Sequence, residues 1–152
     1  MSLTYCTTWI IVLLATIAMM LGCRNSYSDV QIASSATVSQ QWTEIRPAQP
    51  LSWTKPAEEF SFHIDSPHQR SPQAEIIGPS GEHFVPQVEF VTTNGRTIAA
   101  DTHGFWGEDM YFYWSKGGPG AEPIQMIRVR SSLPLNISKL VWRGYDAAKV
   151  KR

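Results

Sequence analysis

The sequence predicts an all-β protein, an antiparallel β-sandwich or jelly roll of about seven or eight strands that follows an N-terminal signal peptide. Short segments in which apolar and polar residues alternate recur along the chain, as in strands that bury one face. Turn residues such as Gly, Pro and Asn separate these segments at roughly 8–12-residue spacing. No stretch before Asp146 repeats apolar residues at helical spacing over three turns, so no long amphipathic helix is expected.

The first 22 residues have the pattern of an export signal. No charged side chain precedes Arg24, and residues 9–22 are mainly apolar. A membrane-spanning helix needs roughly 20 apolar residues, whereas the core of a signal peptide has about 7–15. We therefore expect residues 1–22 to be a signal peptide. The alternative is an uncleaved anchor that spans the membrane with residues 5–23.

The signal-like core ends on Met20-Leu21-Gly22-Cys23, which resembles the lipobox of bacterial lipoproteins. The resemblance implies export through the general secretory route, cleavage before Cys23 and acylation of that cysteine. It also implies a membrane-anchored protein that faces the periplasm. Arg24 after the cysteine favours the outer membrane.

The two cysteines and the charge balance exclude several classes of protein. Cys6 is expected to leave with the leader and Cys23 to carry the lipid, so no thiol remains for a disulfide, a metal or a nucleophile. With 13 basic and 13 acidic side chains, the chain lacks the positive surplus that nucleic-acid binding requires. Its stability is expected to come from an ordinary hydrophobic core.

The remaining chain is expected to have three parts. Residues 23–41, rich in Ser, Gln, Thr and Ala, are expected to be a polar tether, with a first strand entering at residues 37–45. Residues 42–146 are expected to be the β-sandwich, and residues 147–152 a solvated basic tail.

Alternation and turn signals place the strands of the body. The expected strands up to the middle of the chain cover residues 60–65, 74–77 and 83–93. Asn94-Gly95 then predicts a two-residue hairpin turn, because both positions of that turn need positive φ. Residues 110–114 are aromatic on both faces, which is expected of a central strand.

The last two expected strands cover residues 124–130 and 135–142. Only residues 131–134, which include Ser132-Leu133-Pro134, separate them, so we expect them to form a hairpin. This end of the chain is similar to the closing hairpin of galactose-binding-like jelly rolls.

The segment 101–114 carries the strongest candidate for a ligand site. It combines glycines, carboxylates and an aromatic pair on what is expected to be a loop before the central strand. An exposed Trp ring can stack on the C–H face of a sugar, while carboxylates accept hydrogen bonds from hydroxyl groups. Trp106 is the expected platform, with Asp101, Glu108 and Asp109 as its polar partners. In the alternative, Phe105 and Trp106 fold over one end of the core and the carboxylates are merely solvated.

Other candidate sites have weaker patterns. His63 and Asp65 share one face of the expected strand, with His68 nearby, and two of these side chains could approach a cation. A third ligand at defined spacing is missing, so no metal or cofactor is expected. Arg128 and Arg130 share one strand face, which Lys139 would join across the expected hairpin. These cations are expected to pair with acidic groups such as Glu89 rather than to bind polyanions.

No catalytic motif is found in the sequence, and we expect no enzyme. Glu108 with Asp101 or Asp109 could form an acid–base pair only if the fold brought them together. The expected function is that of a lipid-anchored envelope lipoprotein, a non-catalytic structural or assembly module that binds another envelope protein. The alternative is a carbohydrate-binding module that uses the segment around Trp106.

Overall fold

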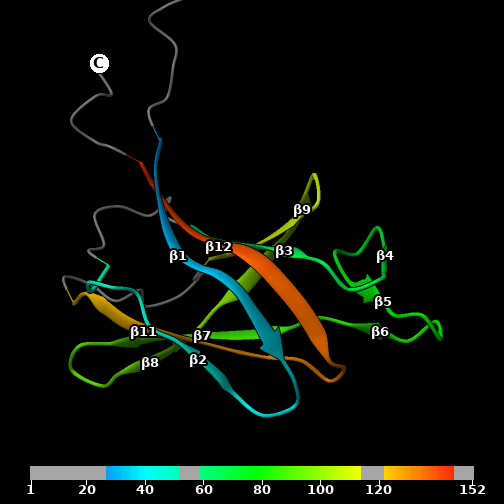
Figure 1. Ribbon diagram of the computed structural model, residues 1–152, viewed down its shortest axis with the longest axis horizontal. Coiled ribbons are helices and arrows are strands. Elements are labelled where there is room, and N and C mark those ends of the chain that lie inside the picture. The colour runs from blue at the N-terminus through cyan, green and yellow to red at the C-terminus, as the bar shows by residue number, and fades with distance from the viewer. Residues whose placement is uncertain (1–26, 52–58, 114–121, 146–152) are drawn as a thin grey trace, which may run out of the picture.

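The computed structural model of the protein describes residues 27–51, 59–113 and 122–145, and Figure 1 traces their strands in chain order. The leader 1–22, Cys23, Trp114 and the tail 147–152 lie outside the described residues. Regular structure in the described ranges is β-strand: β1 (Tyr27–Val38), β2 (Thr43–Ile45), β3 (Glu59–Ile64), β4 (Gln69–Arg70), β5 (Ile76–Ile77), β6 (His83–Phe84), β7 (Gln87–Thr92), β8 (Thr97–Ala99), β9 (Asp101–Trp106), β10 (Asp109–Tyr113), β11 (Ile124–Arg130) and β12 (Leu135–Tyr145). The all-β prediction is confirmed.

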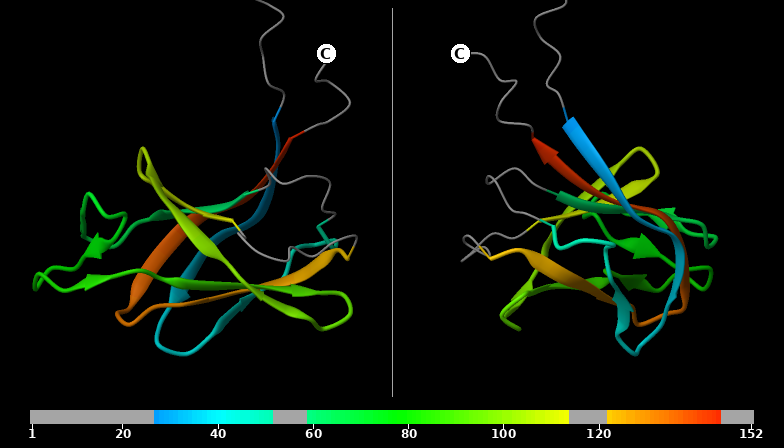
Figure 2. Two further views of the ribbon diagram at one scale, coloured as in Figure 1. Left: turned by 180° about the vertical axis from the view of Figure 1, so that it is seen from behind. Right: turned by 60° about the vertical axis from the view of Figure 1, so that its left-hand side comes forward.

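Eight of these strands pair as a jelly roll. Sheet A has the order β1-β12-β3-β10-β9 and sheet B the order β2-β11-β7-β8, with antiparallel neighbours throughout. The pairing is nested, since β1 pairs with β12, β2 with β11, β3 with β10 and β7 with β8. This is one long hairpin rolled into two facing sheets, which Figure 2 shows edge-on as an upper and a lower layer.

Four further strands complete the described fold. β9 adds a fifth strand to sheet A beside β10. The two-residue strands β4, β5 and β6 form a small sheet C, at the end of the sandwich opposite β1 in Figure 1.

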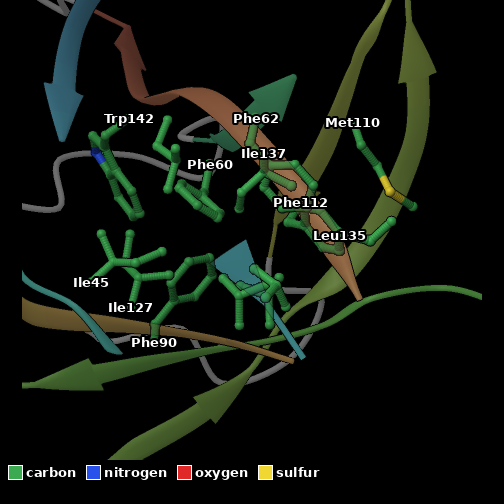
Figure 3. Packing of buried hydrophobic residues seen from close by; sticks show 14 of the residues in the cluster. Ile45, Phe60, Phe62, Phe90, Met110, Phe112, Ile127, Leu135, Ile137 and Trp142 are labelled. Atoms are coloured by element: carbon green, nitrogen blue, oxygen red, sulfur yellow. The ribbon is translucent and has the colours of Figure 1, made fainter. Parts of the chain in front are cut away.

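The core lies between sheets A and B. Inward residues of sheet A, such as Phe60 and Phe112, face inward residues of sheet B, such as Phe90 and Ile127 (Figure 3). The Phe90 ring meets Phe60 edge-on at 6.4 Å and Trp142 edge-on at 5.6 Å between ring centroids. Aromatic pairs in this geometry add to the stabilisation from burial alone.

The expected tether is instead largely a strand. β1 pairs with β12 from Tyr27↔Tyr145 to Val38↔Leu135, with one irregularity between Gln31 and Ala33. The body therefore begins by residue 27 rather than 42. The small polar residues of this segment misled the prediction, because an edge strand that exposes much of its surface needs few apolar side chains.

The expected closing hairpin is also wrong, because β11 lies in sheet B and β12 in sheet A. The chain crosses between the sheets after β11, where Ser131 N–H donates to the Ser39 carbonyl at 2.8 Å. Each strand then gains partners on both edges, β2 and β7 for β11, and β1 and β3 for β12. A hairpin of the two would place both in one sheet and would not close the second layer over the core.

The hairpin at Asn94-Gly95 is confirmed, but its turn is longer than predicted. Thr92 N–H donates to Arg96 O and Gly95 N–H to Thr92 O, both at 2.9 Å, so three residues form the loop. Of the three loop residues, only Gly95 has a positive φ, at 80°. This is the type I turn followed by a left-handed glycine that three-residue hairpin loops favour.

Candidate binding face of sheet A

The side of sheet A that faces away from sheet B carries a continuous set of polar and aromatic side chains. In β10, Met110 and Phe112 point into the core with 0% and 1% exposure. Because side chains alternate along a strand, Asp109, Tyr111 and Tyr113 point the other way. We call this side of sheet A, formed by the outward residues of β1, β3, β9, β10 and β12, the outer face.

Trp106 is the most exposed large apolar side chain of this face, at 76%. It ends β9 and lies opposite Asp109 of β10. The preceding residue, Phe105, lies opposite Met110 and packs against the core. Residues 101–106 therefore form an edge strand and not the expected loop. Because side chains alternate along this strand, the Phe105 ring points inward and the Trp106 ring points outward.

A tight turn holds Trp106 at the tip of the β9–β10 hairpin. Gly107 and Glu108 form a two-residue loop, and Gly107 has a φ of 63°. A left-handed first position followed by an ordinary second one is the type II′ hairpin turn, in which glycine is preferred. The sequence pattern Gly107-Glu108 thus fixes the position of the Trp106 backbone at the hairpin tip.

Sheet C braces this tip from the core side. Arg70 of β4 donates hydrogen bonds to the Gly107 carbonyl and, at 2.7 Å, to Glu108 Oε1. Its guanidinium lies 5.5 Å from the Phe105 ring centroid, and His68 stacks on the same ring at 6.1 Å. Arg70 contacts the turn and the ring below it, so the position of the Trp106 backbone depends on sheet C.

Tyr111 lies between Trp106 and Arg143 on the outer face. The Tyr111 ring centroid is 6.4 Å from that of Trp106 and 5.8 Å from the Arg143 guanidinium carbon. Arg143 in turn donates two hydrogen bonds to Asp29, at 2.9 and 3.1 Å. The hydrogen-bonded Asp29 carboxylate raises the pKa of Arg143 above its ordinary value, so this guanidinium stays charged.

Two histidines of the outer face are paired with carboxylates. His63 Nδ1 is 3.0 Å from Asp109 Oδ1, and its Nε2 is 4.0 Å from Asp65. His103 Nδ1 is 3.2 Å from Glu59 Oε1, and its ring lies 4.0 Å from Tyr113. These pairs orient the carboxylates while leaving them lone pairs for further hydrogen bonds.

The structure brings together three of the four predicted ligand residues. Trp106, Glu108 and Asp109 meet at the hairpin tip, although the Glu108 carboxylate is already bound to Arg70. Asp101 begins β9 opposite Tyr113, five residues from Trp106 and so roughly 16 Å away along the strand. Asp101 therefore does not lie beside Trp106, and the structure does not bring these two residues together.

Sequence reasoning missed Tyr111, Arg143 and Asp29 as members of this face. The alternation within residues 109–113 could have placed Tyr111 beside Asp109. No local pattern could have brought in Arg143 or Asp29, because their neighbours in the sheet come from distant segments.

The other predicted clusters are placed as follows. His68 Nδ1 bonds to Ser66 O at 2.8 Å, and among the described residues no three potential ligands gather around a metal position. Arg128 lies opposite Glu89 in the ladder and forms an ion pair with Glu44 at 3.2 Å. Lys139 does not join it, because β12 belongs to the other sheet.

Comparisons with known proteins add no relative. No family model, no curated protein and no solved structure matches the chain. Within the ranges that the structure describes, no helix has the length and apolar character needed to cross a membrane.

Proposed function

We propose that this chain is a non-catalytic glycan-binding module, held at a membrane by a lipid on Cys23, and that it binds its ligand on the outer face of sheet A. The observation that carries the proposal is the exposure of Trp106, 76%, directly beside the Asp109–His63 pair and Tyr111. An exposed ring beside ordered polar groups offers a ligand a stacking surface and hydrogen-bonding partners at the same place.

Sugars match both parts of this surface. The C–H face of a pyranose is apolar and stacks on an indole, while its hydroxyl groups donate to carboxylates and accept from imidazole or guanidinium groups. Trp106 supplies the platform, and Asp109 and His63 supply an acceptor and a second hydrogen-bonding group on the same face. Arg143 and Asp29 extend the polar surface beyond Tyr111.

The site is also preorganised. Trp106 leaves a type II′ turn whose carbonyl is bound by Arg70, and Asp109 is bound by His63. Ordered side chains lose less conformational entropy on binding than mobile ones do. Weak stacking and hydrogen bonds therefore suffice for measurable affinity.

Replacement of Trp106 tests the proposal. We expect Trp106→Ala to weaken retention on insoluble cellulose, chitin or peptidoglycan at least tenfold, about 1.4 kcal/mol, because the stacking platform is lost. An unchanged melting temperature would show that the fold is intact, since the side chain is exposed.

The matched control is Trp42→Ala. Trp42 lies against Arg130 at 4.4 Å, on sheet B rather than sheet A, so its removal should leave retention unchanged. Equal retention of the wild type and the Trp106 variant would refute the glycan site. The remaining proposal for the outer face would then be protein assembly, the other role expected from the sequence.

The lipid anchor rests on the sequence around Cys23. Only three residues, Arg24 to Ser26, separate that cysteine from the first described residue of β1. An acyl chain there would hold the sandwich close to the bilayer surface. A single chain gives marginal membrane binding, whereas lipoprotein-type multiple acylation gives a stable anchor.

Metabolic labelling with an alkyne fatty acid checks this part. Cys23→Ala should abolish labelling, while Cys6→Ala should leave it unchanged because that cysteine is expected to be removed with the leader. Labelling that survives in the Cys23 variant would rule out the anchor without affecting the glycan site.

A further inference from the structure

The register of sheet A lines up five outward residues in a row that crosses all five strands. The row runs Trp106, Asp109, His63, Ser138 and Ser35, one residue each from β9, β10, β3, β12 and β1. It starts with an aromatic platform and continues with a carboxylate, an imidazole and two hydroxyl groups. Neighbouring strands are about 4.8 Å apart, so the four steps of the row span roughly 19 Å.

The neighbouring row of outward residues is more buried. It contains Gly104, Tyr111, Ser61, Val141 and Gln31 in the same strand order. Glycine and serine occupy two of its positions, and Ser61 is only 4% exposed. Gly104 and Tyr111 are buried as well, so neighbouring side chains cover much of this row, and a ligand that lies across the strands would contact the row that begins at Trp106.

Polar groups recur at each strand along the row. Asp109 and His63 form one pair at 3.0 Å, and Ser138 Oγ donates to Asp65 Oδ1 at 2.9 Å. These carboxylates keep further lone pairs, since each can accept about four hydrogen bonds. The strand spacing is also close to the advance of one sugar ring in an extended glycan, so successive rings would meet successive strands.

The charge of the sheet limits the ligand class. Four carboxylates come from its strands (Asp29, Glu59, Asp101 and Asp109) against two cations (Lys139 and Arg143), a net charge of −2 with His neutral. Asp65, directly after β3, adds another carboxylate to this side. Such a surface repels uronates and sulfated sugars.

We propose that the ligand is an uncharged, extended oligosaccharide that lies across the strands along the row from Trp106 to Ser35, with one sugar unit at each of the five strands. The inference rests on the proposed function and adds the direction, length and charge of the ligand. Trp106 anchors one end of the oligosaccharide, and Ser138 and Ser35 contact only rings that are distant from that end.

Calorimetry of the full-length chain in detergent tests this arrangement. The probes are chito- and cello-oligosaccharides of two to six sugars, with hexagalacturonate as the anionic probe. We expect affinity for at least one neutral series to rise at least tenfold from two to five sugars and then to level off. Hexagalacturonate should bind at least tenfold more weakly than the neutral hexamer.

Ser35→Arg identifies the far end of the row. Ser35 is exposed, so the variant should fold, and it should lower hexamer affinity at least threefold while leaving the dimer unaffected. Thr97→Arg adds the same charge to exposed β8 of sheet B and should change neither.

The outcomes separate the two proposals. Three results would overturn the cross-strand arrangement alone, provided that Trp106→Ala still reduces binding. They are an affinity that does not grow with oligosaccharide length, an equal loss of affinity for dimer and hexamer in Ser35→Arg, and tight binding of hexagalacturonate. If no probe binds, or if Trp106→Ala has no effect, both proposals fail.

Discussion

Gly104 shows how one residue adjusts the edge of the outer face. It lies in β9 with a φ of 90°, and a Cβ built on it would be 2.8 Å from the Cβ of Ala74. Ala74 itself has a φ of 64°, and its N–H donates to the Ser71 carbonyl at 3.2 Å. The loop before β5 can therefore touch β9 only because residue 104 has no side chain.

Gly104→Ala should accordingly be among the more destabilising changes outside the core. It combines the left-handed backbone strain of a non-glycine residue, about 1 kcal/mol or more, with displacement of Ala74. Gly81→Ala has the same strain at a φ of 85° but meets nothing within 4 Å. Urea denaturation should show a loss at least about 1 kcal/mol larger for Gly104→Ala, and equal losses would show that the Ala74 contact has no energetic role.

At the scale of single residues, the sequence singled out side chains that meet at the hairpin tip, but it did not predict their partners. Trp106 and Asp109 are adjacent across the hairpin, as a site requires. Glu108 is instead bound by Arg70, which comes from a strand 38 positions away in the sequence. Such a pairing depends on where sheet C packs, and no periodicity near Glu108 encodes that.

The β9–β10 hairpin is the element on which the proposed site depends, and Arg70 binds its tip from outside the hairpin. Removal of the side chain in Arg70→Ala deprives the Gly107 carbonyl and the Glu108 carboxylate of a donor. The pair is at the surface, so the free energy of unfolding should fall by less than about 1 kcal/mol. The local opening of the hairpin tip should nevertheless become easier.

Hydrogen exchange measures that local effect. Amides of residues 105–110 should lose protection in Arg70→Ala, while Arg46→Ala should leave them unchanged because Arg46 pairs with Glu44 on sheet B. If the tip keeps its protection without Arg70, the turn itself is sufficient to hold Trp106 in place.

Element types were easier to predict than element pairings. Alternation correctly indicated β3 and β7, and aromatic residues on both faces correctly indicated β10. The strand β1 was missed, since its residues are mostly small and polar and it is held by the ladder with β12. A strand whose stability comes mainly from its partner has no clear pattern of its own.

At the scale of the whole molecule, the sheet assignment of β11 and β12 was beyond the reach of the sequence. Proximity in sequence favours a hairpin of β11 and β12, yet the two strands belong to opposite sheets of the sandwich. What decides between these arrangements is burial of both inner faces, with Phe90 of one sheet against Phe60 and Trp142 of the other. This contact joins residues from three distant segments, so it is a property of the completed roll.

The pairing of Tyr27 with Tyr145 has a mechanical consequence. The described chain enters and leaves the sandwich at neighbouring points of two antiparallel strands, which Figure 2 shows side by side. Tension applied between these two points would load the β1–β12 hydrogen bonds one after another, as in a zipper, and not all at once in shear. The molecule should therefore peel open at low force from that end, while β9 and β10, on the far side of the same sheet, are loaded last.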